Sequence, residues 1–261
     1  MQPDIFQLRR RQSALFLLLL AALTYGAILS TSFDIVKGLT AVPRAFTWAV
    51  ANFYPDEGAW RRLPRILEKL LETVLMSISS ATVASSLGLV VALLGATTTR
   101  PHPLFSPPAR AIASVFRNID VSAWALILLF SFGQSAFTGY FAIFFVTFGF
   151  IVRVMIETID EIGTEAVEAL RATGASYIAI ITQSVIPACL PQLISWVLFM
   201  IETNIRSATL VGILTGTGIG FSFDLYYKSL NYNSASLVVI VIVVAVLLIE
   251  ALSNTVRRAV L

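Results

Sequence analysis

Residues 160–187 read DEIGTEAVEALRATGASYIAIITQSVIP and separate two long apolar stretches of the chain. The first half is too polar to lie within a hydrocarbon layer, because it carries four acidic side chains and an arginine. Thr164 is a candidate N-cap for a helix that begins at Glu165, and Gly174 is a candidate for the residue that ends it. The segment is predicted to be a short amphipathic helix, which either lies on a membrane surface or docks in the groove of a partner.

The composition around this segment is that of a polytopic membrane protein. Of the 261 residues, 57% are hydrophobic and 13% are charged, whereas soluble domains carry roughly 45–50% apolar and about 25% charged residues. One Cys and one His exclude a disulfide framework and a Cys/His zinc site, so no metal is expected. The small net charge of +3 gives no support for a nucleic-acid partner.

Six membrane spans are expected, since a helix needs about 20 apolar residues to cross the hydrocarbon core. The apolar run after Arg9 to Arg11 is predicted to remain as an uncleaved first helix, because no signal-peptide cleavage site follows it. Residues 1–65 would then hold the first span and an external loop, and residues 66–261 the membrane core. The predicted spans are 13–33, 74–96, 109–132, 136–157, 186–211 and 236–252.

The basic residues near the span ends predict the orientation. Arg9 to Arg11, the loop 97–108 and Arg257-Arg258 place both termini in the cytoplasm. The loop 34–64 should then be external, although it carries Lys37, Arg44, Arg61 and Arg62 and so departs from the rule. Within that loop, residues 39–53 are apolar enough to form a short helix along the membrane surface.

Two series of small residues predict close helix packing. Ser80, Ala84, Gly88 and Ala92 would form one smooth helix face. The glycine-rich run 212–220 allows two interpretations: a smooth packing face, or a bent and partly unwound segment that acts as a gate. The candidate packing or gate residues are Gly212, Gly216, Gly218 and Gly220.

The segment 160–187 resembles the EAA loop of ABC-importer permeases. Glu168, Ala169, Gly174 and Pro187 match that pattern at its spacing, whereas Leu170, Ser184 and Ile186 depart from it. The resemblance implies an all-α membrane protein with the type I ABC-importer permease fold, in which the helix at 165–174 is a cytoplasmic coupling helix that docks on an ATPase. The residues implied for this contact are Glu165, Glu168, Ala169, Arg171, Thr173 and Gly174.

A second stretch is similar to the phosphonate-type permeases. It pairs Glu202-x-Asn204-x-Arg206-Ser207-Ala208-Thr209 with Val211-Gly212 and Gly218-Ile219-Gly220. This resemblance implies import of phosphonate, phosphite or phosphate through a homodimer in the cell inner membrane. It also implies two cytosolic ATPase subunits, which bind the ATP and Mg, and an external solute-binding protein; the chain itself would hold no cofactor and would not be an enzyme.

Charged residues inside the membrane are costly and are therefore candidates for the translocation pathway. Glu202 and Arg206 are four residues apart, so they either pair internally or line the pathway. In the second case Arg206, helped by Asn204 and Ser207, would contact a phosphorus oxyanion. Arg117 is a further candidate, which with Asp120 would pair or anchor its span.

Other functions remain open from the sequence. A permease for another small solute, such as an amino acid, fits the coupling loop equally well. An ion-coupled secondary transporter would predict inverted repeats, which the sequence does not show. A membrane scaffold without transport activity is a third alternative, which would not copurify with an ATPase.

Overall fold

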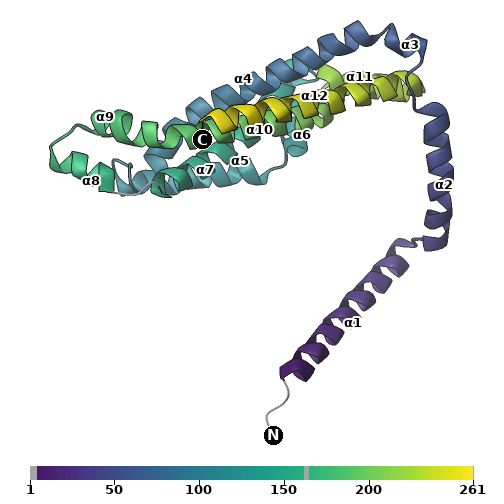
Figure 1. The fold of residues 1–261 in the computed structure, drawn as a ribbon, viewed down its shortest axis with the longest axis horizontal. Coiled ribbons are helices and arrows are strands. Elements are labelled where there is room, and N and C mark those ends of the chain that lie inside the picture. The colour runs from purple at the N-terminus through teal and green to yellow at the C-terminus, as the bar shows by residue number, and fades with distance from the viewer. Residues whose placement is uncertain (1–4, 162–164, 261) are drawn as a thin grey trace. The chain divides into compact units, whose positions relative to one another are not determined.

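The computed structural model describes residues 5–161 and 165–260, and every regular element in these ranges is a helix (Figure 1). The residues form two compact units, Met1–Phe53 and Tyr54–Leu261, whereas the sequence predicts a division after residue 65. The helices are α1 (Ile5–Thr31), α2 (Ile35–Asn52), α3 (Glu57–Trp60), α4 (Leu63–Gly95), η1 (Pro103–Phe105), α5 (Ser106–Asn118), α6 (Val121–Phe132), α7 (Ala136–Glu161), α8 (Glu165–Ala172), α9 (Tyr177–Ile180), the π-helical η2 (Ile181–Val185), α10 (Ile186–Thr215), α11 (Gly218–Lys228) and α12 (Tyr232–Val260).

The first unit consists of two helices. In α1 the stretch Arg9–Thr31 is long and apolar enough to span a membrane. Asp34 caps α2, because its carboxylate accepts a hydrogen bond from the Lys37 backbone N–H at 2.9 Å. The helix expected at 39–53 is thus present within α2, and its position on the membrane surface stays a prediction.

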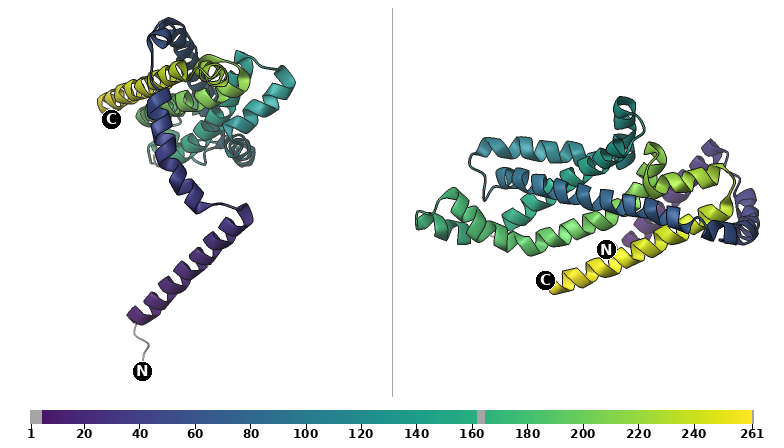
Figure 2. Two further views of the ribbon diagram at one scale, coloured as in Figure 1. Left: turned by 90° about the vertical axis from the view of Figure 1, so that its right-hand side faces the viewer. Right: turned by 90° about the horizontal axis from the view of Figure 1, so that it is seen from above.

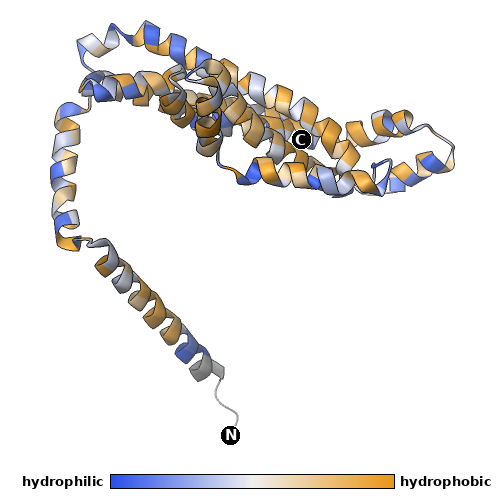
Figure 3. Ribbon diagram, turned by 180° about the vertical axis from the view of Figure 1, so that it is seen from behind, coloured by the Kyte–Doolittle hydropathy of each residue, from blue (hydrophilic) through white to orange (hydrophobic). Residues whose placement is uncertain are grey.

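The second unit contains four further helices of spanning length, Leu63–Gly95, Ala136–Glu161, Tyr177–Thr215 and Tyr232–Ala259. With α1 they give five spans in the described residues, or six if the pair formed by α5 and α6 crosses as one. Figure 3 shows that apolar residues dominate the middle of this helical bundle.

The predicted single helix over residues 109–132 is wrong. The chain bends by 90° between α5 and α6. Ile119 is extended at the bend, and Asp120 then caps α6 by accepting a hydrogen bond from the Ser122 backbone N–H at 2.8 Å. A side chain that caps a new helix favours a break over a continued helix, which explains the bend.

The small-residue series on α4 packs inside the chain as predicted. Ser80, Ala84, Gly88 and Ala92 are all buried. A Cβ atom at Gly88 would lie 2.9 Å from Ile151 Cγ2 of α7, so the two helices are in close contact here. This contact belongs to the core that α4 and α7 share.

The glycine-rich run is bent into a tightly packed turn, and its role as a gate stays a prediction. Gly216 ends α10 with φ of +71°, and α11 begins at Gly218 and folds back onto α10. Gly212 and Gly220 face each other across this turn, since a Cβ at Gly212 would lie 3.3 Å from Gly220 Cα. The Ile219 backbone N–H donates to Thr73 Oγ1 at 2.9 Å, which fixes the turn against α4.

The helices of the second unit run between two distinct ends. Figures 1 and 2 show α8 and α9 at one end, and α3 with the start of α4 at the other. We call these the α8 end and the α3 end.

Candidate functional site: a coupling helix and a central cavity

The helix α8 spans Glu165–Ala172, as the sequence predicts; the proposed cap Thr164 lies outside the described residues. Val167 is 3% exposed and packs on the core shared by α4, α7 and α10, together with the half-buried Leu170. Glu165, Glu168 and Ala169 are exposed. The helix is therefore anchored by one apolar face, while the residues of the EAA-like motif are accessible.

The end of α8 is a left-handed turn. Gly174 has φ of +79°, and the Ala175 backbone N–H donates to the Leu170 carbonyl at 3.1 Å. This arrangement satisfies carbonyl groups at the helix end, and glycine adopts it without strain. Arg171 and Thr173 are exposed beside the turn.

A polar network connects α8 to three helices of the bundle. Arg171 donates to the Thr98 carbonyl at 3.0 Å, in the loop after α4. Asp160 of α7 accepts from the Thr98 backbone N–H at 3.2 Å and from the Thr97 hydroxyl at 2.7 Å, and it pairs with Arg110 of α5 at 3.2 Å. No local pattern predicts this network, because its members are 50 to 73 residues apart in the chain. A displacement of α8 would act on α4, α5 and α7 together.

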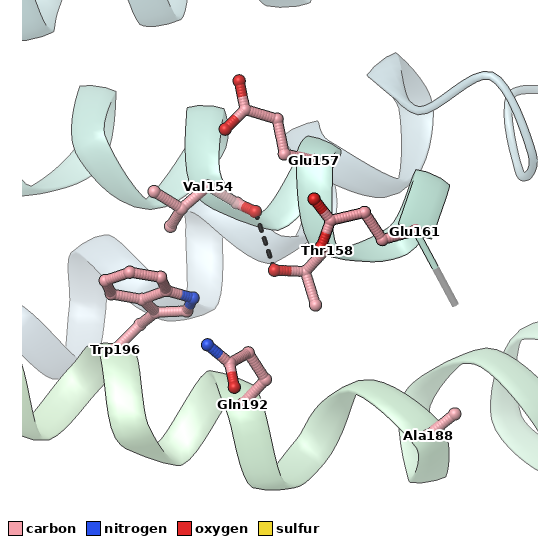
Figure 4. A pocket seen from close by; sticks show the side chains of 7 residues that line it. All are labelled: Val154, Glu157, Thr158, Glu161, Ala188, Gln192 and Trp196. Carbon is pink, nitrogen blue, oxygen red and sulfur yellow. Dashed lines mark hydrogen bonds between the residues drawn. The ribbon is translucent and has the colours of Figure 1, made fainter. Parts of the chain in front are cut away.

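An acidic cavity of about 390 Å³ lies between α7 and α10 near the α8 end. Its lining residues include Glu157, Thr158 and Glu161 of α7, with Gln192 and Trp196 of α10 opposite, and Figure 4 shows the Glu157 side chain turned away from α10. Glu157 pairs with Arg153, and within the described part of the chain the buried Trp196 Nε1 has no hydrogen-bond partner. This acidic lining makes the cavity a poor candidate for an anion site.

A second cavity, of about 170 Å³, lies at the corner between α5 and α6, and we call it the central cavity. It brings together Arg117 with Asn204 and Ser207, three of the five residues that the sequence assigns to a pathway. Thr203 also lines it, and its buried hydroxyl has no hydrogen-bond partner among the described residues. The predicted pair of Arg117 and Asp120 does not form among the described residues; Asp120 lines the cavity and caps α6.

Asn204 is held in place by a buried contact that the sequence did not predict. Its Nδ2 donates to Thr147 Oγ1 of α7 at 3.0 Å, and both side chains are almost fully buried, at 4% and 0% exposure. Thr147 is also within hydrogen-bond distance of the Ile143 carbonyl, at 2.9 Å. The pair joins α7 to α10 beside the central cavity.

Glu202 and Arg206 lie on another face of α10 and do not line the central cavity. They form the predicted ion pair at 3.4 Å, and Glu202 also lies 3.7 Å from Arg257 of α12. The Glu202 side chain is 10% exposed, and two arginines compensate the cost of burying its charge. This cluster holds the end of α12 against α10, and Arg257 is a member that sequence reasoning missed.

Comparisons with known proteins agree with this arrangement. The model of the family described as binding-protein-dependent transport system inner membrane component matches residues 84–260. The phosphite transport system permease protein PtxC of Stutzerimonas stutzeri is 28% identical over 242 residues, which are 91% of this chain and 87% of that protein. The phosphate-import permease protein PhnE of Mycolicibacterium smegmatis is 27% identical over 221 residues, which cover 81% of this chain and 41% of that protein.

The fold is also found among solved structures. A chain of the MetNI methionine ABC transporter in an inward-facing conformation has a TM-score of 0.66 and 23% identity, over 75% of this chain and 96% of that chain. This likeness covers most of the helical bundle and shows that the architecture is that of an ABC-importer permease. The chain therefore belongs to the family of binding-protein-dependent transport system inner membrane components, and it is a multi-pass transport subunit of an ABC importer rather than an enzyme.

Proposed function

We propose that this chain is the permease of an ATP-driven importer that carries a small phosphorus oxyanion: phosphonate, phosphite or phosphate. Two copies would form the pathway, with two cytosolic ATPase subunits and an external binding protein. The observation that carries the proposal is α8, an exposed helix that presents Glu168 and Ala169 at one end of the bundle and is linked by Arg171 to the rest of it. The names of the phosphite and phosphate relatives support the choice of solute.

The orientation follows from the role of α8. If α8 docks on a cytosolic ATPase, the α8 end faces the cytoplasm and the α3 end faces outward. The long helix α12 runs from Tyr232 near the α3 end toward the α8 end, so the C-terminus is proposed to be cytoplasmic. Arg9 to Arg11 lie in α1 just before its apolar run and support a cytoplasmic N-terminus.

In this proposal the partner ATPases bind ATP and Mg, and the permease responds with a conformational change. Closure of the ATPases moves α8, and the contacts of Arg171 with Thr98, and of Asp160 with Arg110, pass that motion to α4, α5 and α7. The far end of α5 is the corner that lines the central cavity. A shift of α5 therefore changes the central cavity directly.

The central cavity suits a weakly held oxyanion. Arg117, the free hydroxyl of Thr203 and the hydroxyl of Ser207 supply donors for phosphoryl oxygens. Asp120 lies in the same wall and opposes the anion electrostatically, which keeps affinity low. Low affinity is what a pathway requires, because a tightly bound ion would not be released.

The proposal is tested by uptake into proteoliposomes that contain the permease with its ATPase and receive the binding protein outside. Phosphate, phosphite and methylphosphonate are compared with methionine as an amino-acid solute. We expect ATP-dependent uptake of at least one phosphorus oxyanion and none of methionine. Uptake of methionine alone, or uptake without ATP, would contradict the proposal.

Arg117→Gln is expected to lower the maximal uptake rate by about tenfold, because it removes the positive charge of the central cavity. The concentration of loaded binding protein at half-maximal rate should stay unchanged, since docking is remote from this cavity. Arg206→Gln is the matched control: it removes an arginine of the same bundle that does not line the cavity, and its effect should be much smaller. A larger loss with Arg206→Gln than with Arg117→Gln, in a normally assembled complex, would refute this assignment.

A further inference from the structure

A third polar cavity, of about 480 Å³, lies at the α3 end, between the first turn of α4 and the end of α11. We call it the arginine cavity. No carboxylate is found among its lining residues, Arg62, Arg65, Leu225, Tyr226, Ser229 and Asn231. It differs in this from the acidic cavity near α8 and from the central cavity, which contains Asp120.

Arg62 is held in position at the cavity by two contacts. Its Nη1 donates to Ser234 Oγ of α12 at 2.8 Å, and its guanidinium carbon lies 5.4 Å from the centre of the Tyr226 ring. Neither contact neutralises the positive charge. The guanidinium is therefore oriented in advance and keeps donors available for an anion.

Arg65 lies one turn further along α4 and forms no ion pair within the described parts of the chain. Glu72 and Asp224 are paired with Lys69 and Lys228, each at 2.7 Å. Glu68 follows Arg65 by three residues on α4, and no ion pair joins the two among the described residues. Two uncompensated arginines thus share one cavity.

The position of these two exposed arginines favours an anion. They lie at the first turn of a 33-residue helix, whose N-terminal end carries a partial positive charge and prefers acidic groups. An anion in the cavity would interact favourably with both guanidinium groups and with the helix end. The same residues belong to the basic segment that departs from the positive-inside pattern of the sequence.

We infer that the arginine cavity is an entry site, which receives a tetrahedral phosphorus oxyanion on the outer face before the ion reaches the central cavity. This inference rests on the proposed function, because that function sets both the orientation and the solute. A concave site lined by guanidinium, phenol and amide groups fits a small ion with several acceptor oxygens. Lipid phosphate groups share this chemistry, so the test must separate the two sources.

The test uses 31P NMR on the permease–ATPase complex in phosphatidylcholine nanodiscs, without binding protein and without ATP. Inorganic phosphate and phosphite are the probes, and broadening of their resonances reports binding in fast exchange. We expect broadening with the wild-type complex, and at least about tenfold weaker binding with Arg65→Gln and with Arg62→Gln. Arg61→Gln removes a neighbouring exposed arginine that does not line the cavity, and it should leave the broadening unchanged.

Three outcomes would overturn the inference. Broadening that is equal in wild type and Arg65→Gln places the ion elsewhere. Arg65 is exposed and has no ion pair among the described residues, so this variant remains informative if Arg62→Gln fails to assemble. Broadening that disappears when phosphatidylglycerol is added assigns the cavity to a lipid headgroup. If the unloaded binding protein, but no lipid, abolishes the broadening, the arginine cavity is a docking site for that protein. The uptake of phosphorus oxyanions by the wild-type complex in proteoliposomes tests the proposed function. Its result does not depend on these three outcomes for the arginine cavity.

Discussion

Gly220→Ala is expected to prevent assembly of the permease. A Cβ at this position would overlap the Thr209 carbonyl oxygen, and it would lie 2.8 Å from the Thr209 carbonyl carbon and 3.0 Å from Ile213 N. All three atoms belong to the backbone of α10, so no side chain can rotate away to make room. The turn between α10 and α11 must open, at a cost of about 3 kcal/mol, which is large compared with the stability of a typical domain.

The measurement is the yield and the melting temperature of the detergent-solubilised complex. Gly26→Ala is the control, because a Cβ there has no atom within 4 Å and the same methyl group is added to a helix. We expect Gly26→Ala to purify like the wild type and Gly220→Ala to be lost or to melt well below it. Equal melting temperatures for the two variants would show that Gly212 and Gly220 are not packed as described.

Ala169→Glu is expected to abolish transport while leaving the permease folded. Ala169 is exposed on α8, and glutamate is a good helix former, so the isolated permease has no reason to lose stability. In the groove of an ATPase the added side chain would be both too large and newly charged. Loss of a central interface contact of this kind lowers affinity by tenfold or more.

Gly174→Asp supports the same test from the other end of α8. A Cβ at Gly174 meets no atom within 4 Å, and aspartate tolerates the left-handed conformation better than most residues. Gln183→Glu serves as control, since it adds an exposed negative charge just beyond α8. Uptake and ATP hydrolysis stimulated by the loaded binding protein should both fall in Ala169→Glu and Gly174→Asp and persist in Gln183→Glu. Normal coupling in Ala169→Glu would show that α8 is only a surface helix.

The sequence predicted the elements whose signals are local. The bounds of α8 follow from good helix formers between Glu165 and Gly174, and the length of each apolar run predicts the long helices. The pairing of Glu202 with Arg206 follows from their spacing on one helix. In these cases the interacting residues are close in the chain, so periodicity and capping suffice.

The sequence contains a local signal for the break between α5 and α6, but the hydropathy of residues 109–132 favours a single helix. Asp120 is a favourable N-cap, and it stands directly before the apolar run Val121–Phe132. A capping residue inside an apolar stretch is evidence for a new helix, and here it separates two helices that meet at 90°. The central cavity exists because of this bend.

The remaining parts of the site depend on contacts between distant segments. Arg257 reaches Glu202, Thr147 reaches Asn204, and Asp160 reaches Arg110. No pattern along one helix predicts which residue of another helix will face it. The separation of Arg206 from Asn204 and Ser207 has the same origin, because the packing of α10 decides which face meets the cavity.

Contact between α8 and an ATPase is the central claim, and a single thiol tests it most directly. The chain has one cysteine, Cys189, which is buried, so Ala169→Cys provides an accessible thiol on α8. A short bifunctional crosslinker is applied to the complete transporter in membranes, and the products are identified by mass spectrometry. The account predicts one permease–ATPase product that depends on Ala169→Cys. A thiol that is labelled by an impermeant maleimide from the external side, and that yields no product with the ATPase, would contradict it.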